Sequence, residues 1–156
     1  MSGEHDFDFL HGGWTVRHRK LRRRLQGCDD WDEFDGTLDA WPTLAGAGNV
    51  DDNYLDDPAG AYRAMAMRSV DPVDGTWSIW WLDGRMPRRL DPPLVGRFVD
   101  GVGTFVCDDS LDGRPIVVRF QWLDTLTSCP RWEQAFSADG GATWETNWLM
   151  WFTRPR

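Results

Sequence analysis

The chain has little that would send it into or across a membrane. No apolar run approaches the roughly 18 residues that a membrane-spanning helix needs. The N-terminal segment has neither the basic region nor the apolar core of a signal peptide. The cysteines, Cys28, Cys107 and Cys129, form no CxxC motif, and their odd number does not suit the disulfide framework of a secreted protein. These features predict a cytoplasmic protein with reduced thiols.

The chain also lacks an excess of basic residues. It carries 17 Lys and Arg against 25 Asp and Glu, which gives a formal net charge of −8. Because bare nucleic acid and anionic membranes both attract basic surfaces, we expect neither as a partner.

Metal and cofactor motifs are missing as well. The three histidines match no zinc spacing, and there is no glycine-rich phosphate loop. The acidic run 49–57 lacks the spacing and the glycine of a calcium loop, so it indicates a solvated acidic loop. Alternatively Asn49, Asp51 and Asn53, at period two, could line the mouth of a barrel. We therefore expect no metal and no cofactor.

Helical periodicity is confined to a short turn around Phe7 and Leu10. Turn signals recur along the chain and separate short runs rich in tryptophan and β-branched residues. The predicted strands are 14–25, 30–41, 49–55, 61–70, 76–82, 95–99, 104–108, 115–123, 131–138 and 142–153. About eight to ten sequential antiparallel strands predict one all-β domain over 1–156, an up-and-down β-barrel with a short N-terminal helical turn.

The basic run 17–24 has an acidic counterpart in the next predicted strand. Six basic residues in this run precede six acidic residues within 29–39. Opposite charges that face each other across a hairpin stabilise the pairing and fix its register. A self-complementary hairpin is therefore the favoured interpretation, and an anion-binding strand is the alternative.

Gly12-Gly13-Trp14 follows the N-terminal turn and opens the first predicted strand. This motif resembles the GxW signature of the lipocalin (calycin) superfamily. The resemblance implies that Trp14 plugs one end of the barrel. It also implies that Arg154, near the C-terminus, packs over the indole, a cation–π contact worth about 0.5–2 kcal/mol.

A second signature, SxDxGxTW, occupies residues 137–144 and matches the Asp-box pattern. Asp139 can accept backbone hydrogen bonds within the turn, and Trp144 can anchor the returning strand. Together the two signatures make the chain similar to a bacterial group of lipocalin-like domains, from Phe7 to Arg154. The resemblance implies the barrel and often a homodimer, and it carries no agreed reaction.

Strand alternation leaves two interpretations of the interior open. In the first, aromatic sets that include Trp122, Trp132, Trp144 and Trp148 face inward. The alternating polar residues Arg119, Glu133 and Asn147 then lie in solvent. In the second, the polar residues form a paired cluster in the cavity and the tryptophans pack against a partner subunit. We favour the first, because exposed strand faces commonly carry Arg and Glu.

Eleven tryptophans are the main excess in the composition. Each large aromatic side chain buries about 150–250 Å², so they predict a cavity suited to a small hydrophobic or aromatic molecule, with His18 as its polar handle. The expected wall residues are Trp31, Trp80, Trp122, Trp132 and Trp148. The proline-rich segment 83–94 is expected to cover the open end, with Arg85 meeting an anionic ligand.

Two other functions remain open. A cofactor-free isomerase, cyclase or hydratase on the same scaffold could transfer protons through His18 with Glu33 or Glu133. Outward-facing tryptophans could instead make the chain a dimeric protein–protein interaction module. The fold by itself does not decide between these functions.

Overall fold

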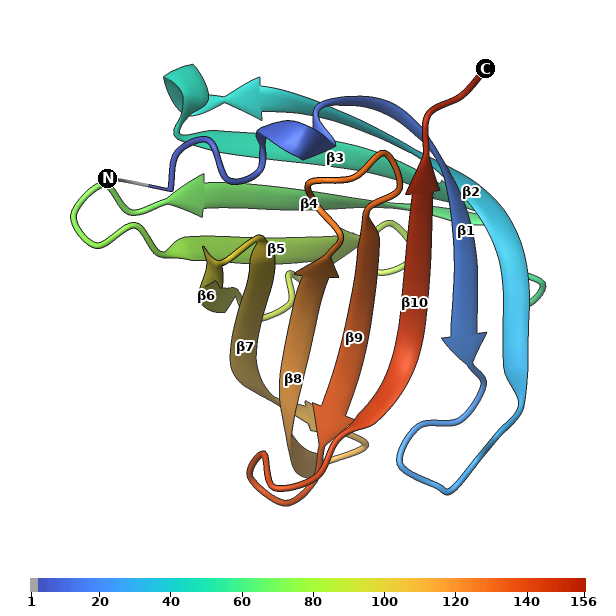
Figure 1. Cartoon of the computed structure of the whole chain (residues 1–156). Helices are drawn as coiled ribbons and strands as arrows, with labels where there is room; N and C mark the ends of the chain where they lie inside the picture. The colour runs from blue at the N-terminus through green and yellow to red at the C-terminus, as the bar shows by residue number, and fades with distance from the viewer. Residues whose placement is uncertain (1–2) are drawn as a thin grey trace.

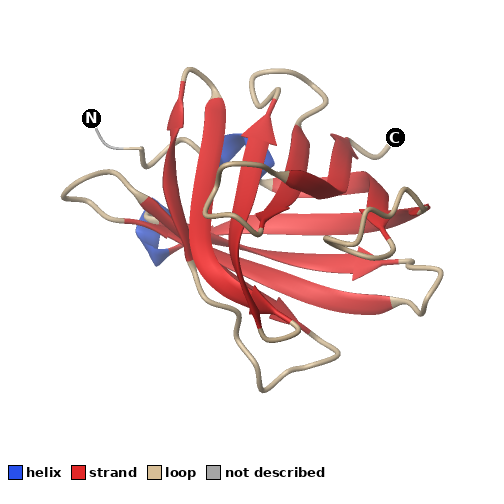
Figure 2. Cartoon of the chain, turned by 90° about the horizontal axis from the view of Figure 1, so that it is seen from below, coloured by secondary structure: helices blue, strands red, loops and turns tan. Residues whose placement is uncertain are grey.

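The computed structural model describes residues 3–156 as a closed antiparallel β-barrel of ten strands, which confirms the predicted all-β fold (Figure 1). Strands that are consecutive in sequence pair with each other, and β1 pairs with β10 to close the barrel, seen from below in Figure 2. The strands are β1 Gly12–Leu21, β2 Trp31–Thr43, β3 Gly48–Leu55, β4 Tyr62–Val70, β5 Trp77–Asp83, β6 Leu94–Val99, β7 Val102–Leu111, β8 Arg114–Leu123, β9 Arg131–Ser137 and β10 Glu145–Thr153.

The helical content of residues 3–156 is two 3-10 turns, η1 (Asp8–Leu10) and η2 (Leu44–Gly46). The first is the predicted N-terminal turn. Over the same residues, no helix has the length and apolar character that crossing a membrane requires.

Strand alternation sends the aromatic sets into the barrel. The buried positions of β8 are Ile116, Val118, Phe120 and Trp122. The adjoining strand β9 contributes Trp132, Gln134 and Phe136 to the same interior. Arg119 and Glu133 alternate with these residues and lie on the outer face. The structure therefore has the aromatic interior of the first interpretation.

A bulge in β10 reverses the alternation of part of that strand. The pairing register of β9 with β10 shifts at Asn147, which is an extra residue with a fully buried side chain. Its side-chain oxygen accepts a hydrogen bond from Gln134 at 2.8 Å. Trp148 faces inward, whereas Trp144 lies outward, with the Arg119 guanidinium 4.3 Å from its ring centroid. The predictions that Trp144 faces inward and that Asn147 lies in solvent are therefore wrong, because the extra residue reverses the alternation between them.

The N-terminal turn and Trp14 seal one end of the barrel. Trp14 is 5% exposed, and its indole nitrogen donates to the Leu10 carbonyl at 2.7 Å. The Arg154 guanidinium carbon lies 3.6 Å from the Trp14 ring centroid. The same guanidinium donates to the carbonyl oxygens of Gly13 and Phe9, at 3.1 and 3.4 Å. Figure 1 shows η1 and the C-terminal end of β10 together at this end of the barrel.

The β1–β2 hairpin carries the expected ion pairs. Arg17 lies 3.4 Å from Glu33 and 3.1 Å from Asp35, and Arg22 lies 2.9 Å from Asp32. Because most of these side chains are half-exposed, each pair adds little stability. Their regular placement across the two strands fixes the register of the hairpin.

The Asp-box turn joins β9 to β10 as its motif predicts. Asp139 accepts hydrogen bonds from the Thr143 backbone nitrogen at 2.9 Å and from the Ser137 hydroxyl at 2.7 Å. The hydrogen bonds from Thr143 and then Ser137 lower the pKa of Asp139 to about 2. Gly140 and Gly141 have φ values of 72° and 96°, a region that L side chains rarely adopt.

Replacing Arg154 with Ala should lower the free energy of unfolding by about 1–2 kcal/mol, because the change removes the stack on Trp14 and two hydrogen bonds. Arg156→Ala, at the exposed C-terminus, is the matched control and should change it by less than about 0.5 kcal/mol. Urea denaturation followed by tryptophan fluorescence measures both variants. Equal effects of the two substitutions would contradict the proposed role of the stack.

Candidate ligand-binding site

A cavity of about 190 Å³ lies inside the barrel at the end opposite the plug. Trp14 stands near the start of β1, whereas Lys20, near the end of this strand, lines the cavity. In Figure 1 the β1–β2 and β9–β10 turns lie at the cavity end, at the bottom of the view. The lining combines apolar rings with a few charged and polar groups: Lys20, Arg24, Tyr62, Trp81, Asp83, Arg85, Asp91, Pro92, Leu94, Cys107, Asp109, Val118, Phe120, Trp132, Gln134, Phe136 and Trp148.

Edge-to-face contacts hold the aromatic wall of the cavity in place. The Trp132 ring centroid lies 4.9 Å from that of Phe120 and 5.4 Å from that of Trp148. Trp81 meets Trp148 at 6.0 Å, with an interplanar angle of 89°. Such pairs contribute about 0.5–1.5 kcal/mol each beyond their burial. The wall is therefore formed before a ligand arrives.

Lys20 and Arg24 place two positive charges inside the rim of the cavity. The Lys20 ammonium donates to the Tyr62 hydroxyl at 3.1 Å and to the Asp57 carboxylate at 3.4 Å. The Arg24 guanidinium lies 5.3 Å from the Phe136 ring, and among residues 3–156 it forms no ion pair. Burial lowers the pKa of both cations, which means that an anion placed beside them would be stabilised.

The segment between β5 and β6 brings Arg85 to the same opening, where the sequence predicts a cation. The Arg85 guanidinium stacks on the Tyr62 ring at 3.6 Å and pairs with Asp83 at 2.7 Å. The hydrogen bond from Arg85 to Asp83 raises the pKa of Arg85. A bridge between Leu82 and Leu90 closes the base of this segment. Arg85 is therefore held at the rim by its own neighbours.

The opposite side of the cavity is acidic. Asp91, Cys107 and Asp109 line it from the β6–β7 side. Burial raises the pKa of Cys107 to about 11, and burial also raises the pKa of Asp91. Because the thiol stays protonated at neutral pH, Cys107 is a poor nucleophile. A ligand thus meets cations on one side of the cavity and carboxylates on the other.

His18 faces the interior but lies behind the wall. It is 1% exposed, it stacks on Phe34 at 4.7 Å, and its Nδ1 accepts a hydrogen bond from the Trp148 indole at 3.1 Å. Burial, and then the charge of Lys20, lower its pKa to about 3. The neutral imidazole therefore orients Trp148. His18 does not line the cavity as predicted, and Lys20 is the polar group of β1 that does.

The structure does not assemble the expected acid–base set. Glu33 lies on the outer face of β2, where its carboxylate pairs with Arg17 and Arg19. Glu133 lies on the outer face of β9, paired in register with Leu149 of β10. Because both glutamates point away from the interior that holds His18, the three residues form no common site.

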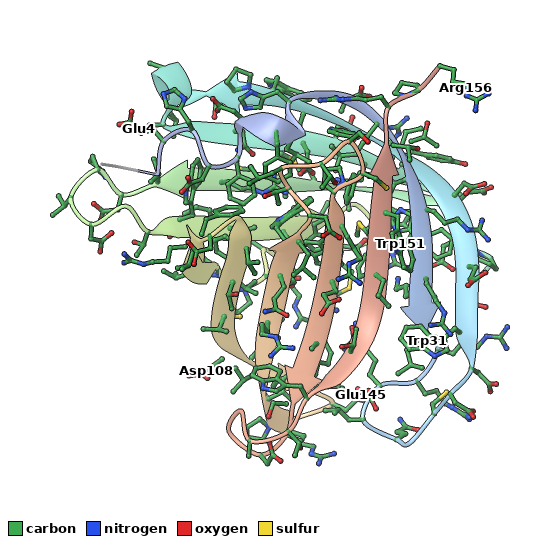
Figure 3. All side chains as sticks on the ribbon, viewed as in Figure 1. Glu4, Trp31, Asp108, Glu145, Trp151 and Arg156 are labelled. Carbon is green, nitrogen blue, oxygen red and sulfur yellow. The ribbon has the colours of Figure 1, made fainter. Side chains whose placement is uncertain are left out.

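Two of the predicted wall tryptophans lie outside the cavity. Trp31, labelled in Figure 3, opens β2 on the outer face. The Arg19 guanidinium lies 4.4 Å from its ring centroid. Trp80 lies on the outer face of β5 and lines a shallow surface hollow. The inward position belongs to the next residue, Trp81. Because the two tryptophans are adjacent in the sequence, their residue type does not indicate which one faces the interior.

A buried polar cluster forms a floor between the cavity and the plug. Asp51 and Arg68 form an ion pair at 2.6 Å, with side chains 1% and 5% exposed. Arg68 also donates to Asn49 at 2.9 Å and lies 5.9 Å from the Trp122 ring. A second cavity, of only about 30 Å³, lies against this cluster. Trp122 therefore belongs to the floor, below the wall formed by Trp132.

The expectation of a solvated acidic loop at 49–57 is wrong for the first half of the run. Residues 48–55 form β3, and Asn49, Asp51 and Asn53 are each at most 2% exposed. The alternative, in which these three residues face the barrel, gives the correct face but the wrong depth. Pairing with Arg68 of β4 is a long-range contact, which the local sequence pattern does not encode.

Comparisons with known proteins place the fold. No protein-family model and no curated protein matches the chain. Among solved structures, the S-type phycobiliprotein lyase CPES from Guillardia theta is similar, with a TM-score of 0.62 and 12% sequence identity. The match covers 100% of this chain and 94% of that chain. At this identity the likeness shows the fold alone, which is a lipocalin-like β-barrel.

The low pKa of His18 makes the free energy of unfolding decrease as the pH is lowered. The folded-state pKa is about 3 and the ordinary value is 6.5, so the unfolded chain takes up this proton first as the pH falls. The stabilisation is full above the unfolded pKa, and about 2 kcal/mol of it is lost on reaching about pH 5. His18→Gln should flatten this part of the pH dependence, as measured by urea unfolding near neutrality and near pH 5.

The matched control for that measurement is His5→Gln, since His5 is exposed and pairs with Asp8. This variant should keep the acid-induced loss. If His18→Gln instead shows the same loss as the unmodified chain, the buried imidazole does not cause it.

Proposed function

We propose that this protein binds a small hydrophobic or aromatic molecule in the barrel cavity. The observation that carries the proposal is a preformed cavity of about 190 Å³ with aromatic walls and a few charged groups at its rim. Small-molecule sites typically combine apolar walls with a small number of placed polar groups. The rings of Phe120, Trp132 and Trp148 offer both faces and edges to a planar ligand.

The rim favours a ligand with an anionic end. Arg24 and Lys20 lie on one side of the opening, and Arg24 has no ion-pair partner within residues 3–156. A carboxylate placed against the guanidinium would gain a charge-assisted, two-point hydrogen bond. We infer that the ring system enters first and that the anionic group stays at the rim.

The positions of His18, Glu33 and Glu133 favour a binding function over proton-transfer catalysis by these three residues. His18 is neutral and covered by Trp148, and the two glutamates lie outside the barrel. The similar solved structure is named a phycobiliprotein lyase, so a protein with this fold carries the name of an enzyme.

Cytoplasmic location, membership of the bacterial lipocalin-like group and a homodimer stay predictions from the sequence. A dimer would find its apolar contact area at the hollow beside Trp80.

Filling the cavity should weaken binding. Val118 lines the cavity from β8, so Val118→Phe puts a ring into the space that the ligand needs. We expect the affinity for β-naphthoate and β-naphthylmethanol to fall at least about tenfold, a loss of about 1.4 kcal/mol. Quenching of tryptophan fluorescence and titration calorimetry measure the affinities.

Val106→Phe is the control for this test, because Val106 lies on the outer face of the adjoining strand and is 43% exposed. It should leave both affinities unchanged. Saturable one-to-one binding that survives Val118→Phe would place the ligand elsewhere on the protein, and absence of binding to the unmodified chain would refute the proposal for these ligands.

Arg24 should discriminate between the two probes. Arg24→Gln removes the unpaired cation and should weaken β-naphthoate by about tenfold, which is within the range for a lost charge-assisted hydrogen bond. The neutral β-naphthylmethanol should bind as before. Arg23→Gln, one residue earlier in the same loop, is the control, since Arg23 is not among the residues that line the cavity. Equal weakening of both probes by Arg24→Gln would contradict the proposed orientation of the ligand.

A further inference from the structure

Lys20 is the single lysine of the chain, whose other 16 basic residues are all arginine. It occupies an inward-facing position of β1, where it lines the cavity with a side chain only 18% exposed. An arginine at this place would supply the same charge. A lysine supplies in addition a primary amine, which can become a nucleophile when its pKa is lowered.

Two aromatic rings flank the Lys20 ammonium. Its nitrogen lies 4.5 Å from the Trp148 ring centroid and 5.3 Å from that of Tyr62. Burial among these rings lowers the pKa of Lys20, and the charges of Arg24 and Arg85 lower it further. The Asp57 carboxylate acts in the opposite direction, but the net direction is downward. Removal from water and neighbouring cations are the two conditions that make lysine amines reactive in proteins.

Two proton-carrying groups contact the same nitrogen. The Tyr62 hydroxyl lies 3.1 Å away and the Asp57 carboxylate 3.4 Å away, and the Asp57 side chain is only 7% exposed. Asp57 can take the proton of the ammonium and later return it. The Tyr62 distance lies within the range for direct proton transfer, which is about 2.6–3.2 Å, and the Asp57 distance is slightly longer.

We propose that Lys20 captures an aldehyde or ketone group of an aromatic ligand as an imine on its Nζ. The inference rests on the proposed cavity-binding function and names the substrate class of the same site, an aromatic carbonyl compound. The competing interpretation is that Lys20 serves only as the ion-pair partner of Asp57. The two interpretations differ in whether a covalent bond forms.

The atoms and electrons of the capture balance without an external oxidant or reductant. Asp57 accepts a proton from the ammonium, and the free amine adds to the carbonyl carbon while one of its protons passes to the carbonyl oxygen. The resulting carbinolamine receives the proton back from Asp57 at its hydroxyl group, directly or through Tyr62, and loses water. One ammonium and one carbonyl thus give one protonated imine and one water, with the carboxylate of Asp57 restored beside the positive nitrogen.

The test treats the folded protein with β-naphthaldehyde and sodium cyanoborohydride, which reduces an imine to a stable secondary amine. Mass spectrometry of the intact chain counts the adducts, and peptide mapping separates Lys20 from the α-amino group. We expect one adduct, at Lys20, formed at least about tenfold faster than at the same lysine in the urea-unfolded chain. Tyr62→Phe keeps the ring and removes the hydroxyl group that contacts the Lys20 nitrogen, so it should slow this labelling.

The alcohol β-naphthylmethanol separates the capture from simple binding, because it has the same ring system and no carbonyl group. Lys20→Arg keeps the cation and should bind the alcohol while losing the adduct, and Lys20→Met serves if the arginine does not fit. If both probes quench tryptophan fluorescence and no adduct forms at Lys20, the inference is overturned and the binding function stands. Labelling of Lys20 no faster than in the unfolded chain also overturns it. If neither probe binds, the proposed function fails and the inference fails with it.

Discussion

The pairing of β1 with β10 is the constraint on which the rest of the structure depends. This pairing closes the sheet, and Trp14 and Arg154 meet at one end of the seam. At the other end the same two strands bring His18 and Lys20 next to Trp148. The seam that completes the barrel therefore also builds the wall of the cavity that carries the amine.

The barrel interior is layered along its axis. The plug lies at one end, then the Asp51–Arg68 ion pair, then the aromatic wall, and last the charged rim. Removing one partner of a buried ion pair is strongly destabilising, because the other partner is left as an uncompensated buried charge. The layer below the wall is therefore intolerant of change, whereas the rim has charges that can accommodate a ligand.

Local patterns were sufficient to predict most strands and the Asp-box turn, because each depends on residues close together in sequence. The plug was predicted from the resemblance of the GxW motif, since Trp14 and Arg154 lie at opposite ends of the chain. The bulge at Asn147 was not predictable, since one inserted residue changes which side chains face inward without changing composition. Trp80 and Trp81 were ambiguous for a related reason, since a one-residue difference in register exchanges their faces.

The inward position of Lys20 was not predicted, because its neighbours in the sequence are also charged. Its basic run suggested a charged outer face, and Arg17 and Arg22 do pair with acidic residues of the next strand. Alternation from Trp14 through His18 points Lys20 inward, so the signal was present in the period of two. Its contacts with Asp57 and Tyr62 come from other strands and loops, and such contacts have no local sequence signature.

The floor formed by Asp51 and Arg68 gives the barrel the form of a cup rather than a tube. A guest molecule has to leave by the route through which it arrived, past the segment that carries Arg85. For the proposed function, the depth of the cup sets an upper limit on the length of the bound molecule.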